Sequence, residues 1–242
     1  MTTFSHDEIE QLAQQFETMY PQEILTWAAE TFGSKLALVT SFQPTGLVTL
    51  HMMHTIAPDV PVLTIDTDLL FPETYRLIDE VADRFKLNLV RVKPTLSLAQ
   101  QAQCCGENLW ETNPNECCNM RKVAPLGMAL AGFDAWITGV RRDQSPTRAN
   151  TPVISWDRRY LMIKLCPFAT WTEEMIWTYV QAHDLPYNEL HDRHYPSIGC
   201  WPCTQPVDDE HGYNRDGRWA GHHKTECGLH APPEESPEQT RV

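Results

Sequence analysis

The chain has 242 residues, and 42% of them are hydrophobic, which is enough for the core of one large α/β domain or of two small ones. The formal net charge of -13 argues against a broad basic face for nucleic acid and against binding to anionic membranes. No apolar run reaches the length of about 18 residues that a membrane span needs. The first residues also lack the basic-then-apolar pattern of a secretion signal. We therefore expect a soluble, cytoplasmic protein without nucleic-acid or membrane partners, in which the cysteines are free thiols, metal ligands or catalytic groups.

The chain begins with a helical lead-in, which we place at residues 1–33. Ser5 and Glu8 have the spacing of a capping box, and Pro21 suits the first turn of a second helix that ends at Gly33.

From residue 34 to residue 230 the pattern predicts one α/β domain. Apolar runs that suit strands occupy residues 36–40, 60–65, 87–92, 135–140 and 160–165. Helical stretches begin near Thr45 and Pro72, cover residues 116–131, and extend from an N-cap at Thr172 to residue 183. Strands that alternate with helices form parallel sheets, so we expect a doubly wound, mostly parallel sheet with a loop-rich C-terminal segment. Residues 231–242 are rich in proline and charge, and we expect a disordered tail there.

Two cysteine pairs suggest a metal centre. Cys117 and Cys118 are adjacent, whereas two residues separate Cys200 from Cys203. A Cys-x-x-Cys pair alone is also compatible with a redox dithiol or with chance. Adjacent side chains diverge by about 100° on a helix. Two adjacent ligands therefore suit a cluster with several irons better than a single metal ion.

The residues around the adjacent pair favour anionic ligands. We take Asn115 as an N-cap, which places both cysteines in the first turn of a helix, where free N–H groups and the dipole stabilise thiolates. Arg121 and Lys122 follow the two cysteines by four residues and return to the same helical face. The alternative is a pair of buried free cysteines followed by solvent-facing basic residues.

The remaining adjacent pair, Cys104 and Cys105, precedes Gly106 in a segment without such basic support. We interpret this pair, and Cys166, as ordinary thiols.

Cys227 stands apart from the pairs, near the end of the expected domain. Lys224 and His230 lie close to it in sequence, and Arg215 and Arg218 join them if the loop folds back. Cations lower the pKa of a thiol and increase the thiolate needed for nucleophilic attack. Cys227 is therefore a candidate nucleophile. The alternative is that basic residues lie near this cysteine by chance.

Two loops are candidates for binding phosphate or sulfate. Residues 41–46, with Ser41, Thr45 and Gly46, connect a predicted strand to a helix, a geometry that presents backbone N–H groups to a phosphate. This loop has no Walker lysine, and an ordinary βα turn is the alternative. Arg141 and Arg142 directly follow another predicted strand, where α/β proteins place ligand-binding loops, and a solvated basic loop is the alternative there.

Together these residues resemble the assimilatory adenylyl-sulfate (APS) reductases, which are relatives of the 3'-phosphoadenylyl-sulfate (PAPS) reductases. The resemblance covers residues 36–230 and rests on the order of four segments: 117–125, 140–145, 200–203 and 226–230. It implies an adenine-nucleotide α-hydrolase-like fold. It also implies a 4Fe-4S cluster on Cys117, Cys118, Cys200 and Cys203, a feature that marks APS users within the family.

The resemblance further implies a reaction and the residues that perform it. Cys227 attacks APS, AMP leaves, and thioredoxin or a glutaredoxin-like donor releases sulfite from the resulting S-sulfocysteine, in sulfate assimilation and cysteine biosynthesis. The implied substrate-binding residues are Ser41, Thr45, Gly46, Lys122, Arg141, Arg142, Arg215, Arg218 and His230.

Three questions stay open on the sequence. The substrate is PAPS if the enzyme needs the 3'-phosphate. The chain is a nucleotide-binding module without catalysis if the four cysteines hold a structural zinc. The oligomeric state is not fixed, and a homo-oligomer is compatible with the sequence.

Overall fold

The computed structural model describes residues 4–207 and 215–230, and the expected tail at residues 231–242 lies outside this part of the chain. Six strands form one sheet in the order β3-β2-β1-β4-β6-β5. Their bounds are β1 Leu36–Val39, β2 Val62–Ile65, β3 Leu89–Val92, β4 Ala135–Thr138, β5 Ile154–Asp157 and β6 Met162–Leu165. All neighbouring strands are parallel except β5, which pairs antiparallel with β6 at the edge. The expectation of a doubly wound, mostly parallel sheet is confirmed.

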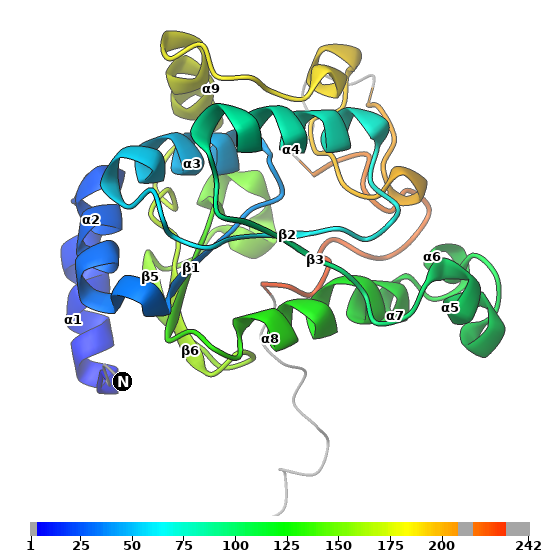
Figure 1. Cartoon of the computed structure of the whole chain (residues 1–242), viewed down its shortest axis with the longest axis horizontal. Helices are drawn as coiled ribbons and strands as arrows, with labels where there is room; N and C mark the ends of the chain where they lie inside the picture. The colour runs from blue at the N-terminus through cyan, green and yellow to red at the C-terminus, as the bar shows by residue number, and fades with distance from the viewer. Residues whose placement is uncertain (1–3, 208–214, 231–242) are drawn as a thin grey trace, which may run out of the picture.

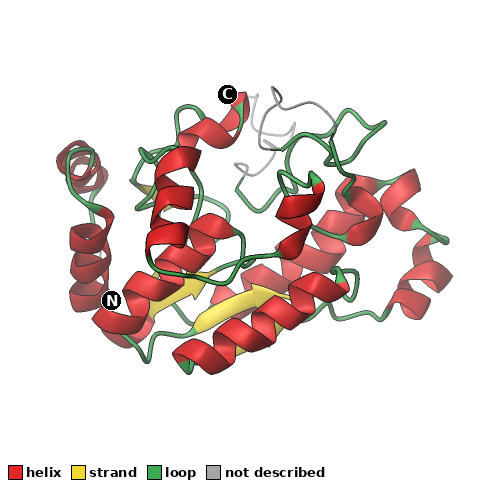
Figure 2. Ribbon diagram, turned by 90° about the horizontal axis from the view of Figure 1, so that it is seen from above, coloured by secondary structure: helices red, strands yellow, loops and turns green. Residues whose placement is uncertain are grey.

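Helices cover both faces of the sheet (Figures 1 and 2). The long helices are α1 His6–Phe16, α2 Pro21–Phe32, α3 Pro44–Ile56, α4 Pro72–Phe85, α5 Leu98–Cys105 and α9 Glu173–Ala182, and the short ones are α6 Leu109–Thr112, α7 Pro114–Cys118 and α8 Ala124–Leu130. Side chains alternate along β1: Leu36 and Leu38 join the core under α2, α3 and α4, while Ala37 and Val39 pack toward α8. Because both faces of β1 are buried, its sequence is apolar throughout.

Local signals set most helix ends as expected. Ser5 and Glu8 form the capping box of α1, and Thr172 caps α9 by accepting from Met175 N–H. The cysteine-bearing helix starts two residues, about half a turn, earlier than we predicted, because Asn113 and not Asn115 accepts the hydrogen bond from Glu116 N–H. Cys117 and Cys118 are consequently the last two residues of α7 and follow its first turn.

A π-helical segment, Asn119–Val123, joins α7 to α8 in one continuous helix. Such segments widen the helix locally and are frequent at functional sites. Here the segment contains Arg121 and Lys122, so both basic side chains leave the helix where its regular spacing is interrupted.

The structure adds elements that periodicity did not predict. Strand β5 and helix α6 are short, and α5 and α6 have few buried side chains, which explains the weak pattern. Within residues 4–207 and 215–230, none of the helices combines the length and apolar character needed to cross a bilayer.

Candidate active site

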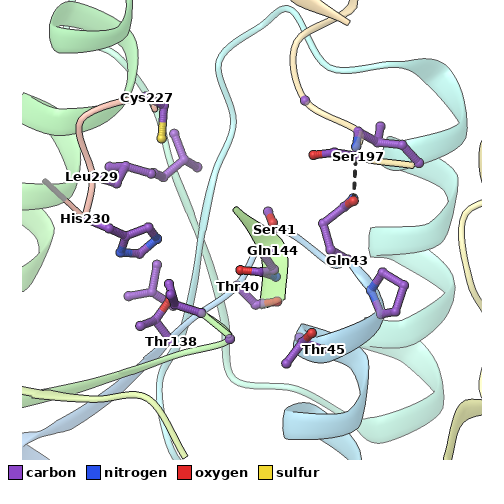
Figure 3. A pocket seen from close by; sticks show the side chains of 18 of the residues that line it. Thr40, Ser41, Gln43, Thr45, Thr138, Gln144, Ser197, Cys227, Leu229 and His230 are labelled. Carbon is purple, nitrogen blue, oxygen red and sulfur yellow. Dashed lines mark hydrogen bonds between the residues drawn. The ribbon is translucent and has the colours of Figure 1, made fainter. Parts of the chain in front are cut away.

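The principal pocket lies at the carboxyl ends of β1, β2 and β4, and residues after each of these strands line it. The chain adds β2 and β3 on one side of β1 and β4 on the other, so β1 and β4 flank the point where the strand order reverses. Open α/β sheets bind ligands at this switch point. Figure 3 shows Thr40, Ser41 and Thr138 at the floor of the pocket, with Cys227 and His230 on one side and Gln43 and Ser197 on the other.

The loop after β1 is built to approach a ligand closely. Phe42 adopts a positive φ of 55°, and its N–H donates to Thr40 Oγ1 at 3.0 Å. Gly46 lies in the first turn of α3, where an added Cβ would stand 2.2 Å from Thr40 Oγ1. Glycine therefore lets the helix start pack against the loop, and Ser41, Thr45 and Gly46 all line the pocket as the sequence predicts.

Arg141 ties this loop to the end of β4. The side chain is 4% exposed, donates to Thr45 Oγ1 at 2.5 Å, and pairs with Asp143 at 2.9 Å. Its neighbour Arg142 turns the other way, pairs with Glu17 at 2.5 Å and donates to Thr151 O. Arg142 is not among the residues that line the pocket, so the structure brings only one of the two predicted arginines to the site.

The pocket is strongly basic in a protein of net charge -13. Its charged lining residues are Lys122, Arg141, Arg148, Arg215, Arg218 and, as the single carboxylate, Glu173. This local excess of cations suits an anionic ligand. Sequence analysis missed Arg148, because it lies in a polar loop with no motif and reaches the pocket only through the fold. Thr138 ends β4, within the strand predicted at residues 135–140, and Gln144 lies in the segment 140–145, but neither was singled out as a site residue.

Cys227 enters the pocket on a segment without regular secondary structure. Burial raises the pKa of its thiol, but Lys122, Arg215 and a hydrogen bond from Leu229 N–H outweigh burial and lower the pKa below the ordinary value. The thiolate needed for nucleophilic attack is therefore stabilised. Of the cations named from the sequence, only Arg215 is among the charges that lower this pKa; Lys122, far away in sequence, acts in place of Lys224, and burial lowers the pKa of His230 so that it is neutral.

Ion pairs hold this terminal segment against the domain. Glu226 pairs with Arg148 at 2.8 Å and with Arg215 at 3.3 Å. Burial and the charge of Arg148 lower the pKa of Arg215 to about 10, so it stays protonated at neutral pH. Gly228, with φ of 89°, lies against Val123, where an added Cβ would stand 3.3 Å from a Val123 methyl group. The segment is thus fixed by side-chain contacts from three separate parts of the chain.

Several residues that line the pocket carry a buried polar atom without an intramolecular partner. Within the described part of the chain these include Arg218 Nε, His191 Nε2 and His230 Nδ1, and all three residues line the pocket. His230 stacks on Trp136 with the ring planes 7° apart. Because buried polar groups are rarely left unpaired, these atoms indicate a polar ligand that completes their hydrogen bonds.

The four predicted metal ligands lie beside this pocket. The loop containing Cys200 and Cys203 is held by Trp201 N–H, which donates to Leu69 O at 2.8 Å. Cys200 Sγ lies 3.2 Å from Thr67 Oγ1, and the charge of Cys200 acts on the thiols of both Cys117 and Cys118. The fold therefore brings together two cysteine pairs that are far apart in the sequence.

Burial disfavours the charged form of these thiols. It raises the pKa of Cys117 to about 11 and that of Cys203 to about 12. Burial also opposes the charge of Lys122, but the nearby thiolates of Cys200, Cys118 and Cys227 raise its pKa. Lys122 thus lines the pocket and also lies near the predicted metal ligands. Its charge stabilises the thiolates of Cys118 and Cys200 as well as that of Cys227.

The sequence matches the phosphoadenosine phosphosulfate reductase domain over residues 35–206. The chain belongs to this family. An adenosine 5'-phosphosulfate reductase of Salinibacter ruber is 52% identical over 91% of this chain and 88% of its own length. The enzyme of the same name from Staphylococcus haemolyticus is 50% identical over 86% of each chain. The resemblance on which the sequence analysis rested is confirmed, and the chain is an oxidoreductase that acts on sulfur compounds.

A solved member of the family supports the fold. The phosphoadenylyl-sulfate (PAPS) reductase from Candida auris, crystallised as a phosphate complex, aligns with a TM-score of 0.75 and 34% identity, over 85% of this chain and 99% of that chain. The FMN adenylyltransferase of Candida glabrata has a TM-score of 0.59 at 15% identity over 93% of this chain, which shows a shared fold alone.

Proposed function

We propose that the chain reduces adenosine 5'-phosphosulfate (APS) to sulfite and AMP in assimilatory sulfate reduction, and so supplies sulfite for cysteine biosynthesis. The observation that carries this proposal is the Cys227 thiol, with its lowered pKa, in a pocket that contains five basic side chains and one carboxylate. We place the reaction in the cytoplasm, where thioredoxin keeps thiols reduced.

The two ends of the pocket suit the two ends of the substrate. The first turn of α3, with Ser41, Thr45 and Gly46, offers backbone N–H groups and hydroxyls to the phosphate, and Arg141 braces this turn. Arg215 and Arg218 lie on the same segment of chain as Cys227 and bind the sulfate oxygens. His230 Nδ1 supplies a further polar contact. Arg142, which pairs with Glu17, takes no part in binding.

The proposed reaction has two stages. The Cys227 thiolate attacks the sulfate sulfur, the bond from sulfur to the phosphate oxygen breaks, and AMP leaves with that electron pair. The product on the enzyme is S-sulfocysteine. Lys122, Arg215 and Arg218 stabilise the charge that moves onto the leaving phosphate and the sulfonate oxygens.

A dithiol donor completes the cycle. One thiolate of thioredoxin, or of a glutaredoxin-like donor, attacks Cys227 Sγ, and sulfite leaves with the electron pair of the sulfur–sulfur bond. The mixed disulfide is then resolved by the second thiol of the donor, which is oxidised by two electrons while the sulfate sulfur is reduced by two. Because residues 225–230 belong to no strand or helix and ion pairs of Glu226 hold them, the end of the chain that carries Cys227 can leave the pocket to meet the donor.

The four cysteines fit a 4Fe-4S cluster better than a zinc ion. Cys117 and Cys118 are adjacent at the end of α7, and adjacent side chains diverge by about 100° on a helix, which makes two bonds to a single ion difficult. Cys117, Cys118, Cys200 and Cys203 would hold the cluster, since four thiolates are its usual ligands. Thr67 Oγ1 and Lys122 are placed to interact with the bound thiolates. When bound, the cluster joins the two cysteine-bearing segments and sets the electrostatic field around Lys122.

The test is sulfite release by anaerobically purified protein with APS or PAPS and thioredoxin, together with the iron and sulfide content. We expect an iron-loaded protein that produces sulfite and AMP from APS. When APS carries a label on its sulfate sulfur and the donor is omitted, we expect the label to stay bound to Cys227. If the protein prefers PAPS to APS, its substrate is PAPS. A zinc-loaded protein that produces no sulfite from either nucleotide would overturn the proposal.

A further inference from the structure

The exposed pair Cys104 and Cys105 stands outside the chemistry described so far. The two residues end α5, and neither lines the pocket. Their Sγ atoms are 2.8 Å apart, although adjacent side chains on a regular helix diverge by about 100°. Two accessible thiols in contact are the arrangement of a dithiol that closes to a disulfide when oxidised.

The end of α5 allows that closure. Gly106, with φ of 88°, takes the chain out of the helix directly after Cys105, and an added Cβ at Gly106 would meet nothing within 4 Å. The last turn is held by Gly106 N–H, which donates to Ala102 O, and by Cys104 Sγ, which donates to Gln101 O at 3.4 Å. Forming the sulfur–sulfur bond requires these two contacts to rearrange at the free end of a helix, and it displaces no buried core.

Helix α5 is connected to the predicted metal ligands through the buried side chain of Gln101. Gln101 is 2% exposed, and its Oε1 accepts from Arg121 Nη1 at 3.0 Å. Arg121, itself 1% exposed, donates to Thr67 O at 2.7 Å and pairs with Asp68 at 2.8 Å. Since Thr67 contacts Cys200, a continuous chain of contacts connects the last turn of α5 to the loop beside the active site.

We propose that Cys104 and Cys105 form a reversible redox modification site that takes hydroperoxides and, when oxidised, lowers the activity of the enzyme. One thiolate attacks the peroxide, becomes a sulfenic acid and releases water or an alcohol. The neighbouring thiol then displaces hydroxide from the sulfenic sulfur, which leaves as a second water, so that two thiols lose two electrons and two protons. A disulfide between adjacent residues is strained and exposed, and dithiol donors therefore reduce it readily.

Mass spectrometry tests the modification directly. Cleavage after glutamate separates Cys104 and Cys105, in the fragment 81–107, from Cys117 and Cys118 and from Cys227, which begins the fragment 227–234. After limited hydrogen peroxide, we expect fragment 81–107 to lose two hydrogen atoms, to resist alkylation and to recover both thiols with dithiothreitol. In the Cys104→Ser and Cys105→Ser single variants, dimedone should instead trap a sulfenic acid. Complete alkylation of both thiols after peroxide has oxidised Cys227 would overturn the proposal.

Activity measurements test the coupling to the active site. The double variant Cys104→Ser/Cys105→Ser should keep the basal rate within about twofold, because both side chains are exposed. Under peroxide doses that close the pair, the wild-type rate should fall by about twofold to thirtyfold more than that of the double variant. If both proteins lost the same fraction of their rate while the disulfide was present in the wild type, the proposal that oxidation lowers the activity would be overturned. The mass measurements need no substrate, so they stand apart from any failure of the proposed APS reaction.

Discussion

The pocket has two walls of different construction. One wall consists of loops at the ends of β1, β2 and β4, where backbone pairing in the sheet fixes each loop. The other wall is the segment 215–230, which has no strand or helix: an isolated bridge between Arg218 and Thr204 anchors its start, whereas Glu226, Gly228 against Val123 and the stacking of His230 on Trp136 hold its end. The first wall is rigid and suits binding, whereas the end of the second can detach and suits transfer of a sulfur group between two partners.

The largest expected effect comes from removing Cys227, the nucleophile that the second wall carries. Cys227→Ser should lower sulfite formation by at least about 10⁴-fold, because a hydroxyl at neutral pH does not replace the thiolate. APS should still bind, since the cationic side chains that line the pocket remain. Sulfite release and equilibrium binding of APS are the two measurements, with Cys104→Ser as the control that removes an exposed thiol. Sulfite production at the wild-type rate would refute the role of Cys227.

The next largest effect concerns the first wall. Arg141→Gln removes the guanidinium that joins Thr45 to Asp143, and kcat/KM for APS should fall by about 10²-fold. Arg141→Lys should restore little, because a lysine lacks the planar fork that holds both partners. Arg142→Gln is the matched control: it breaks the pair with Glu17 outside the pocket and should leave kcat/KM unchanged. Equal losses in both glutamine variants would contradict this assignment.

The two walls also differ in how far sequence predicts them. Apolar runs and helix caps located β1 to β4 and α3, and the position of Ser41 and Thr45 after a strand was enough to place them in the pocket. Arg148 could not be found in this way, because contacts with Glu226, 78 residues further along the chain, bring it to the site. The N-cap at Asn113 was missed because Asn115 has the same chemistry, and only the hydrogen bond to Glu116 N–H distinguishes them.

A smaller change sharpens the comparison by moving one side chain of the second wall. A Cβ at Gly199 would stand 2.1 Å from Arg218 Nη2, the mobile end of a long side chain. Gly199→Ala should therefore displace the guanidinium of Arg218 and lower kcat/KM for APS by about tenfold, the smaller of the losses typical for a misplaced charged contact.

Thermal unfolding distinguishes this effect from a folding defect. The melting temperature of Gly199→Ala should stay close to that of Gly132→Ala, where the added Cβ meets nothing within 4 Å. An unchanged kcat/KM in Gly199→Ala would show that the position of Arg218 does not limit catalysis.

The smallest expected effect is on docking of the terminal segment, and it depends on pH. Burial would raise the pKa of Glu226, but the hydrogen bond and charge of Arg148, with the charge of Arg215, lower it below 4.5. A carboxyl with a lowered pKa stabilises the docked state above its ordinary pKa and loses this contribution as the pH falls through the lowered value. Docking should therefore be complete at neutral pH and weaken in acid below 4.5.

Glu226→Gln should remove this pH dependence and cost about 1 kcal/mol of docking free energy at neutral pH, because charged hydrogen bonds from Arg148 become neutral ones. Hydrogen exchange of residues 215–230, corrected for intrinsic rates, should be faster in Glu226→Gln at both pH 7 and pH 4, whereas the wild type should accelerate only in acid. Thr147→Val is the matched control, since it removes the hydroxyl that donates to Glu226 and leaves both ion pairs. Equal protection in wild type and Glu226→Gln would mean that Gly228 and His230, and not the ion pairs, hold the wall in place.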